Sequence, residues 1–306
     1  MASPQDIRRR GAFHAIERAG LGYCVEGACS FVWEPSFQEA AQWRDELEAS
    51  YSHYRGLDPA DGPGSRPYAG AVYGPISSRR LGRSLGVNLS PPGRSVCTFR
   101  CVYCEYRPDA GKVKARWTAP KRVAQDLSIA LPRAGCLDSI TISGHGEPTL
   151  HPRFADVVDA VLGEARGLRP EVPVRVLTNG TGAIREPVRR GLDALDERIV
   201  KIDAAPGQIN RPVRTEHLGS LIQALSMLRE ISVQSCFVEG VVSNTGAAAI
   251  REWIELIGEL QPRRVQVYTV DRRPGSSVVH PVPVAHLEDI AGRLRDATGL
   301  EARAFA

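Results

Sequence analysis

Short apolar runs rich in β-branched residues alternate, from residue 84 onward, with longer stretches that carry apolar residues at helical spacing. This alternation predicts repeated strand–helix units that build a parallel sheet, an α/β fold. We expect strands at residues 85–89, 139–143, 174–178, 199–203, 233–239 and 265–270. We expect helices at residues 119–130, 153–164, 184–195, 218–229, 247–260 and 284–297. These units are too few for a closed eight-stranded barrel.

The first 65 or so residues lack this alternation. They contain two stretches at helical spacing, residues 5–19 and 37–51, and then a Gly- and Pro-containing loop at residues 61–65. We therefore expect a small, mainly helical N-terminal extension over residues 1–65 and a core domain over residues 66–306. The extension could cover an open mouth of the core or simply stabilise it.

Length and composition bound the class of protein. The 306 residues, 42% of them hydrophobic, can bury one large core or two modest ones. No apolar run reaches the ~18 residues that a membrane span needs, and no apolar segment follows the charged residues 1–10. We therefore expect no membrane contact and a cytoplasmic location. Seven cysteines, an odd number, do not suggest a disulfide framework, which fits a reducing compartment.

The charged residues are biased in type more than in sign. The net charge is +4, yet all but four of the 39 basic residues are arginine. Arginine binds carboxylates and phosphates through two parallel hydrogen bonds, so this bias is compatible with an anionic substrate. A compositional bias on an ordinary surface would look the same, because charge balance says little about partners.

Three cysteines form the most informative motif of the chain. Cys97, Cys101 and Cys104 supply three thiolates from eight residues of one loop that follows the first expected strand. A four-iron cluster held there would keep one iron without a protein ligand. The next cysteine is Cys136, and no histidine occurs between residues 99 and 143. The alternatives are reduced structural thiols or a zinc site completed from elsewhere in the fold.

The cysteine run resembles the signature of the radical S-adenosylmethionine (SAM) enzymes. In that family the amino and carboxylate groups of SAM's methionine moiety bind the free iron. Residues 73–88 look like the lead-in of the branch that includes the wyosine-forming tRNA enzymes and many members of unknown substrate. Residues 141–150 look like the family's Gly-Gly-Glu-Pro segment, with His145 in place of the first glycine. Together these motifs cover about residues 70–280, and the resemblance implies an incomplete six-stranded (β/α)6 barrel.

The resemblance also implies contacts to SAM. It places Tyr103 beside the adenine, Gly144, Gly146 and Glu147 at the methionine amino group, and Asp203 at the ribose hydroxyls. Chemistry in parallel α/β folds gathers at the carboxyl ends of strands, and these residues follow expected strands. Further strand-end candidates are Thr178, Asn179, Lys201 and Glu239. Without the cysteine loop, the glycine turn would be an ordinary turn and Asp203 a helix cap.

Other residues carry weaker signals. His145 and His151 match no metal motif by their spacing, which favours surface or supporting positions. Arginines near the cysteine loop and after the last strand could bind a phosphate or carboxylate: Arg79, Arg80, Arg83, Arg272 and Arg273. Cys24 and Cys29, with Cys136 or Cys236, could hold a second cluster, although isolated cysteines are more often small buried hydrophobes.

The resemblance implies an enzyme that reductively cleaves SAM at a 4Fe-4S cluster to a 5′-deoxyadenosyl radical, which abstracts hydrogen from a substrate. The sequence names no catalytic residue beyond this cofactor machinery. We expect a small, anionic metabolite as substrate and flavodoxin or ferredoxin as electron donor. A tRNA substrate is less favoured, because the net charge is modest and aromatics are only 6% of residues. A non-catalytic iron–sulfur or zinc protein is the second alternative.

Overall fold

A computed structural model of the chain describes residues 67–91, 95–106, 117–211, 221, 223–225, 227–228, 230–270 and 278–305. The expected extension over residues 1–65, with its two helices, its loop, Cys24 and Cys29, lies outside the described residues. So do Arg272 and Arg273.

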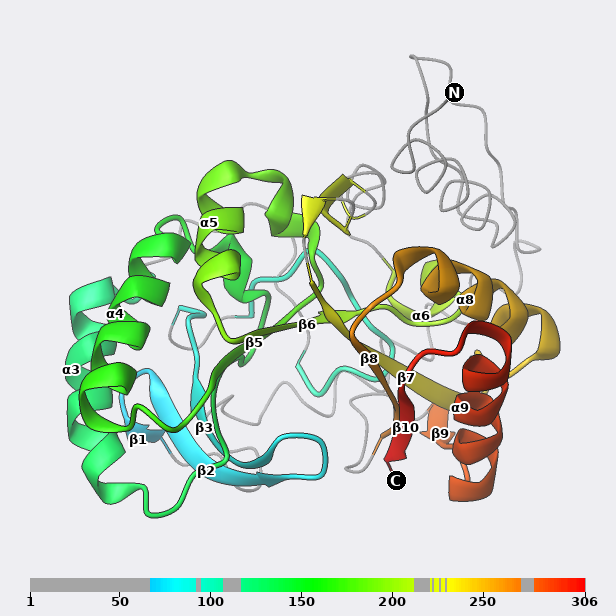
Figure 1. The fold of residues 1–306 in the computed structure, drawn as a ribbon, viewed down its shortest axis with the longest axis horizontal. Helices are drawn as coiled ribbons and strands as arrows, with labels where there is room; N and C mark the ends of the chain where they lie inside the picture. The colour runs from blue at the N-terminus through cyan, green and yellow to red at the C-terminus, as the bar shows by residue number, and fades with distance from the viewer. Residues whose placement is uncertain are drawn as a thin grey trace.

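A ten-stranded curved sheet runs through the described part of the chain (Figure 1). Its parallel strands follow one another in chain order: β3 (Gly82–Val87), β4 (Ser139–Ile142), β5 (Val174–Thr178), β6 (Glu197–Lys201), β7 (Ser232–Gly240), β8 (Arg264–Thr269) and β10 (Ala302–Phe305). All the strands expected from the sequence are present, with ends that differ by up to three residues. Strand β10, which pairs with β8, was not expected because only four residues form it.

Antiparallel strands precede this parallel array, and one more pairs with the end of β7. Strand β1 (Pro67–Ala69) pairs with β2 (Val72–Ser78), and β2 pairs with β3. Short β9 (Val279–Pro281) pairs with the end of β7. In the turn between β2 and β3, Ser78 Oγ accepts from the backbone nitrogens of Arg80 and Leu81, a serine turn typical of hairpins. The β2–β3 hairpin therefore forms most of residues 73–88, where the sequence predicted only one strand.

The helices follow the expected order. They are α3 (Pro120–Ala130), α4 (Phe154–Leu168), α5 (Glu186–Ala194), α8 (Ala247–Leu260) and α9 (Val284–Thr298), with short turns η2 (Leu131–Arg133), η3 (Pro148–Leu150), η4 (Thr181–Ile184) and α6 (Pro206–Ile209). The expected helix at 184–195 begins two residues late because Pro187, which lacks an N–H, has to lie in a first turn. The described residues within 218–229 are mostly helical.

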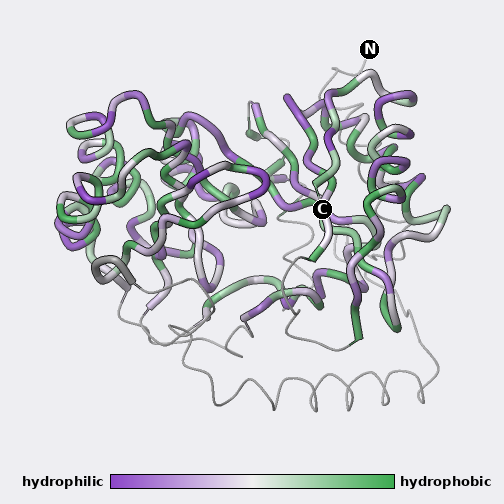
Figure 2. Tube along the Cα trace, turned by 90° about the horizontal axis from the view of Figure 1, so that it is seen from below, coloured by the Kyte–Doolittle hydropathy of each residue, from purple (hydrophilic) through white to green (hydrophobic). Residues whose placement is uncertain are grey.

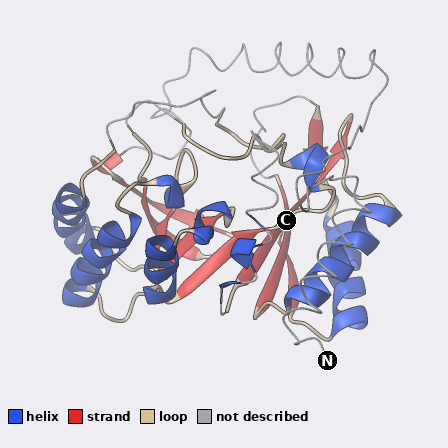
Figure 3. Ribbon diagram, turned by 90° about the horizontal axis from the view of Figure 1, so that it is seen from above, coloured by secondary structure: helices blue, strands red, loops and turns tan. Residues whose placement is uncertain are grey.

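The helices cover the outer face of the curved sheet, with α3, α4 and α5 on one side and α8 and α9 on the other (Figures 1 and 3). The buried residues of these helices are mainly apolar, and hydrophobic and hydrophilic residues alternate along them in Figure 2. Every residue of β4 is buried, as expected of a parallel strand covered on both faces. The inner, concave face of the sheet faces the interior of the molecule. A curved, open parallel sheet with helices on its outer face is the expected partial barrel.

No helix in the described ranges is both long enough and apolar enough to cross a bilayer.

The hairpin tip reaches β8, the strand next to the far edge strand β10 of the parallel array. The Arg80 guanidinium lies 3.7 Å from the centroid of the Tyr268 ring on β8, and Arg79 Nη2 donates to Thr269 O at 3.3 Å. A cation over an aromatic ring is attracted by its negative face. The hairpin thus connects β3 with β8 across the open side of the sheet.

Trp253 on α8 is the largest fully buried side chain of the described core. Its ring packs edge-on against Phe237 on β7, and Nε1 donates to Ser235 Oγ at 2.9 Å. Trp253→Ala is expected to lower the free energy of unfolding by about 3–5 kcal/mol, through the cavity and the lost hydrogen bond. Urea denaturation measures the change. Ile129→Ala, at a 47% exposed site on α3, should change it by less than about 0.5 kcal/mol.

Candidate functional site

The Cys97–Cys104 loop lies at the carboxyl ends of the parallel strands. Phe99 and Val102 alternate with the cysteines and are buried, which fixes the loop to the core. The backbone nitrogen of Val102 donates to Ile209 O at 2.8 Å, beyond the end of β6. A loop fixed by its apolar side chains and its backbone leaves the three sulfurs in defined places.

Each cysteine sulfur accepts a hydrogen bond. Phe99 N donates to Cys97 Sγ and Tyr106 N to Cys104 Sγ, both at 3.4 Å, while Asn210 Nδ2 lies 3.3 Å from Cys101 Sγ. Donors directed at sulfur stabilise a thiolate more than a thiol. The loop therefore fits a group that binds thiolates.

Burial works against ionisation of these thiols in the protein alone. It raises the pKa of Cys97 and Cys101, and it raises the pKa of Cys104 to about 12. A bound metal removes the thiol protons outright, since its charge is the largest in such a site. Within the described ranges, no three His, Cys, Asp or Glu side chains surround one point that a single ion could fill. In an iron–sulfur cluster each cysteine binds its own iron, so the sulfurs need not meet at one point.

The turn from Gly144 to Glu147 packs directly on the cysteine loop. A Cβ on Gly146 would overlap the carbonyl oxygen of Val96, the residue before Cys97, and a Cβ on Gly144 would overlap the Asn88 side chain. Glu147 N donates to the same Val96 oxygen at 2.8 Å. Glycine is therefore required here by the close approach of two backbones.

The Glu147 carboxylate is buried and bonded within the protein. Oε1 accepts from the Thr149 hydroxyl at 2.6 Å, from Thr149 N at 3.1 Å and from the Thr178 hydroxyl, and Oε2 accepts from Asn179 N at 2.7 Å. Burial raises the pKa of Glu147, and these donors oppose that rise. The expected SAM contact residues Glu147, Thr178 and Asn179 thus form one network between the ends of β4 and β5.

Asn179 carries this network on to the cysteine loop. Its Nδ2 donates to Thr98 Oγ1 at 2.7 Å and lies 3.7 Å from Cys97 Sγ. Its Oδ1 accepts from the backbone and the hydroxyl of Thr181. All polar atoms of the Asn179 side chain are therefore used in placing the loop.

Asp203 lies two residues beyond the end of β6, with its side chain fully buried. Oδ2 accepts from the Tyr103 hydroxyl and from Asn210 Nδ2 at 2.7 Å. Oδ1 accepts from Cys236 N at 2.6 Å and pairs with Lys201 Nζ at 3.2 Å. The expected SAM contacts Tyr103 and Asp203 are thus joined to each other, and Asp203 has four protein partners.

Lys201 extends this network to β8. Its Nζ donates to the Tyr268 hydroxyl at 2.7 Å. Burial disfavours the Lys201 cation, but the buried Asp203 carboxylate beside it raises the pKa of Lys201. Burial raises the pKa of Tyr268 to about 12. Lys201 therefore stays charged and Tyr268 stays neutral at physiological pH.

Three other candidates lie elsewhere. Glu239, 39% exposed, faces His286 at 3.2 Å rather than the site. Arg83 does not approach the cysteine loop as expected, because its side chain donates to Ala134 O at 3.4 Å, at the other end of the strands. His151 is buried rather than at the surface, and its Nδ1 accepts from Arg153 N while Nε2 faces Thr118 O at 2.9 Å. Burial lowers the pKa of His151, which fits this neutral, structural ring.

His145 stays at the turn, where its ring lies 4.3 Å from that of Tyr106. Of the further cysteines, Cys136 is exposed and Cys236 is buried beside Lys201 and Asp203.

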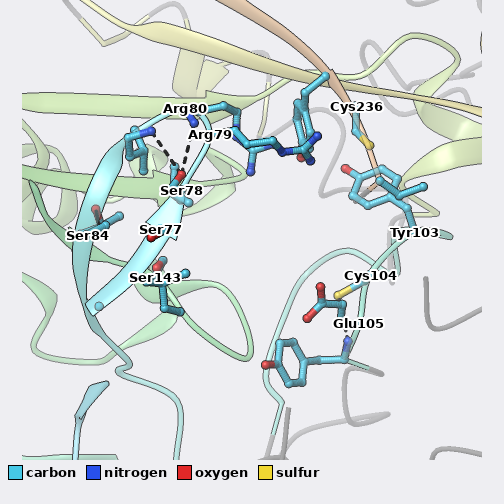
Figure 4. A pocket seen from close by; sticks show the side chains of 18 of the residues that line it. Ser77, Ser78, Arg79, Arg80, Ser84, Tyr103, Cys104, Glu105, Ser143 and Cys236 are labelled. Carbon is cyan, nitrogen blue, oxygen red and sulfur yellow. Dashed lines mark hydrogen bonds between the residues drawn. The ribbon is translucent and has the colours of Figure 1, made fainter. Parts of the chain in front are cut away.

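A cavity of about 360 Å³ lies between the β2–β3 hairpin and the cysteine loop (Figure 4). Hairpin residues Ser77, Ser78, Arg79 and Arg80 line it from one side, and Tyr103, Cys104, Glu105 and Tyr106 from the other. Cys236 and Tyr268 complete the wall next to Lys201. The volume suits a small molecule, and the two arginines give its hairpin side positive charge.

Sequence reasoning missed Asn210 and Tyr268. Tyr268 precedes the last residue of β8, so the rule that selected strand-end residues could have found it. Asn210 follows the four-residue α6, and no sequence pattern marks it.

The comparisons with known proteins agree with this geometry. The family model described as the radical SAM superfamily matches residues 95–257, more than half of the chain. In fold the chain is similar to SuiB of Streptococcus suis in its S-adenosylmethionine-bound crystal structure, with a TM-score of 0.51 and 14% identity, over 72% of this chain and 50% of SuiB. The chain therefore belongs to the radical SAM superfamily, whose members are enzymes that bind SAM and a 4Fe-4S cluster.

Within that superfamily the chain groups with the UPF0026 proteins. It is 31% identical over 218 residues to UPF0026 protein slr1464 of Synechocystis. The matched region covers 64% of this chain and 74% of that protein. It is 26% identical over 204 residues to GTP 3′,8-cyclase 2 of Mycobacterium tuberculosis, over 64% of this chain and 51% of the cyclase. The chain spans between 30% and 74% of the length of the curated relatives that it matches.

Gly146→Ala tests whether the turn sets the position of the cysteine loop. The added Cβ meets backbone of Val96, which cannot move aside as a side chain could, so the loop has to shift. We expect the iron and sulfide bound per chain after anaerobic reconstitution to fall by more than half. Gly163→Ala on α4 is the matched control, since nothing lies within 4 Å of its added Cβ. Equal iron content in the two variants would contradict this role of the turn.

Proposed function

We propose that this enzyme uses Cys97, Cys101 and Cys104 to hold a 4Fe-4S cluster, binds SAM beside it, and acts on a small anionic metabolite. The observation that carries the proposal is the cavity, which places Tyr103 and Cys104 on one side and two arginines on the other. A molecule in that cavity would touch both the cofactor side and the positive side.

When bound, the cluster and SAM supply the reductive cleavage of SAM and the hydrogen abstraction from the substrate. The protein's residues bind and orient the cluster, SAM and the substrate. The turn at Gly144 and Gly146 packs against Asn88 and the Val96 backbone, and so holds the start of the cysteine loop in place. We assign Tyr103, Glu147, Thr178, Asn179 and Asp203 to the SAM side of the site, where the last four also hold the loop in place.

The positive side of the cavity accounts for an anionic substrate. Arg80 and Lys201 both contact Tyr268, and Asp203 pairs with Lys201. The acidic Glu105 lies on the cysteine-loop side of the same cavity. Arg79 adds a further cation at the cavity wall. A carboxylate or phosphate in this cavity would form charge-assisted hydrogen bonds with the guanidinium groups. The distant similarity to a GTP cyclase makes nucleotides the first class to test.

Anaerobic reconstitution tests the cofactor chemistry. With SAM and dithionite, the wild-type chain is expected to release 5′-deoxyadenosine, measured by mass spectrometry. Cys101→Ala removes one thiolate and should reduce the product to background. A wild-type chain with a fully loaded cluster and no deoxyadenosine above the Cys101→Ala level would refute the proposal. An electron donor such as flavodoxin or ferredoxin should replace dithionite.

The role of the cavity arginines is tested by the affinity for GTP, used as a probe and measured by isothermal titration calorimetry. Arg80→Gln removes a charged donor at the cavity wall and should weaken binding about 10- to 100-fold, the loss of roughly 1.5–3 kcal/mol. Arg83→Gln lies on the same hairpin but outside the cavity and should bind like wild type. Equal GTP affinities of wild type and Arg80→Gln would refute an anion site at Arg80. Steeply salt-dependent tRNA binding without GTP binding would favour the tRNA-modifying alternative.

A further inference from the structure

Asn210 donates to a cysteine sulfur from outside the cysteine loop. Its side chain is buried, and Nδ2 lies 3.3 Å from Cys101 Sγ and 2.7 Å from Asp203 Oδ2. An amide nitrogen carries two hydrogens, so it can donate to both atoms at once. Both atoms are acceptors when Cys101 is a thiolate, which also fixes which end of the amide faces them.

The backbone of the same segment fixes Asn210 relative to Cys101. Arg100 N donates to Asn210 O and Val102 N donates to Ile209 O, both at 2.8 Å, so the residues on either side of Cys101 are bonded to this segment. Asp203 is itself fixed by Cys236 N and Lys201 Nζ. The amide therefore has little freedom to turn away from the sulfur.

We propose that Asn210 is a positioning residue that raises the reduction potential of the cluster by donating this N–H to the Cys101 sulfur. The inference rests on the proposed function, since it takes Cys101 as a cluster ligand. Reduction adds negative charge to the cluster. An N–H dipole with its positive end at a ligand sulfur stabilises that charge, so the hydrogen bond favours the reduced state. Burial strengthens the effect because little water is present to screen it.

Asn210 differs from the other donors to cysteine sulfur in the described ranges. Phe99 N and Tyr106 N are backbone donors two residues from the cysteines that they bond, so these bonds follow from the conformation of the loop itself. Asn179 Nδ2 is 3.7 Å from Cys97 Sγ and has a closer partner in Thr98 Oγ1 at 2.7 Å. The Tyr103 hydroxyl also acts on Cys101 and lowers the pKa of that thiol, but it donates to Asp203 Oδ2. Replacing Asn210 removes the 3.3 Å contact to Cys101 Sγ and leaves the backbone bonds of the loop in place.

The test is a redox titration of the reconstituted cluster, followed by electron paramagnetic resonance without substrate. Asn210→Leu keeps nearly the same volume and removes the donor. Its midpoint potential is expected to be more negative than that of wild type. Asn244→Leu is the matched control: Asn244 is equally buried and bonds Val238 N and Cys236 O, but it contacts none of the three cysteines. It should lower stability and leave the potential unchanged.

The sign of the shift separates this role from a merely structural one. Water entering a loosened site would stabilise the more charged, reduced cluster and move the potential in the positive direction. An unchanged or more positive potential in a loaded Asn210→Leu chain therefore overturns the inference while leaving the proposed function intact. A wild-type chain that loads no cluster overturns both.

A second measurement avoids substitution altogether. In wild type labelled with ¹⁵N in the asparagine side chains, pulsed electron paramagnetic resonance of the reduced cluster should detect a ¹⁵N coupling from Asn210, stronger than that from Asn179, whose Nδ2 lies farther from its sulfur, at 3.7 Å against 3.3 Å. A spectrum without that coupling overturns the inference even if Asn210→Leu fails to bind a cluster.

Discussion

The site depends on buried hydrogen bonds that fix one loop against the ends of three parallel strands. Residues after β4, β5 and β6 each bond the Cys97–Cys104 loop or the residue before it: Glu147 N to Val96, Asn179 to Thr98, and Asn210 to Arg100 and Cys101. A buried polar group without a partner costs about 1–3 kcal/mol, so these contacts are made together or lost together. The loop is therefore held at several points along its length, as the proposed three-cysteine cluster site needs.

Two buried carboxylates organise these bonds. Glu147 joins β4 to β5, and Asp203 joins β6 to Tyr103 in the loop and to Cys236 on β7. Each accepts four hydrogen bonds, which compensates for removing a carboxylate from water. Lys201 adds a charge partner for Asp203. Because Lys201 also donates to the Tyr268 hydroxyl, it fixes a side chain of the cavity wall relative to Asp203. Cofactor side and substrate side are thus built from one connected set of polar contacts.

The hairpin gives the cavity its second wall. Parallel strands alone would leave the sheet open between its edge strands β3 and β10, whereas the hairpin tip places Arg80 on Tyr268 and Arg79 at Thr269, both on β8. Positive charge then lies opposite the cysteine loop, inside a space of about 360 Å³.

The sequence by itself determined the strand–helix order, the three cysteines and the glycine turn, because these features are local: periodicity marks elements, and close spacing marks ligands. The resemblance of the motifs to a family selected Tyr103 and Glu147, and strand-end positions selected Thr178, Asn179 and Asp203. Only the tertiary structure decided which of them meet, because partners such as Tyr103 and Asp203 are a hundred residues apart. It separated Arg80, in the cavity, from Arg83, outside it, although the two lie on one hairpin. It also brought Asn210 to Cys101, a contact across 109 residues that no local pattern can encode.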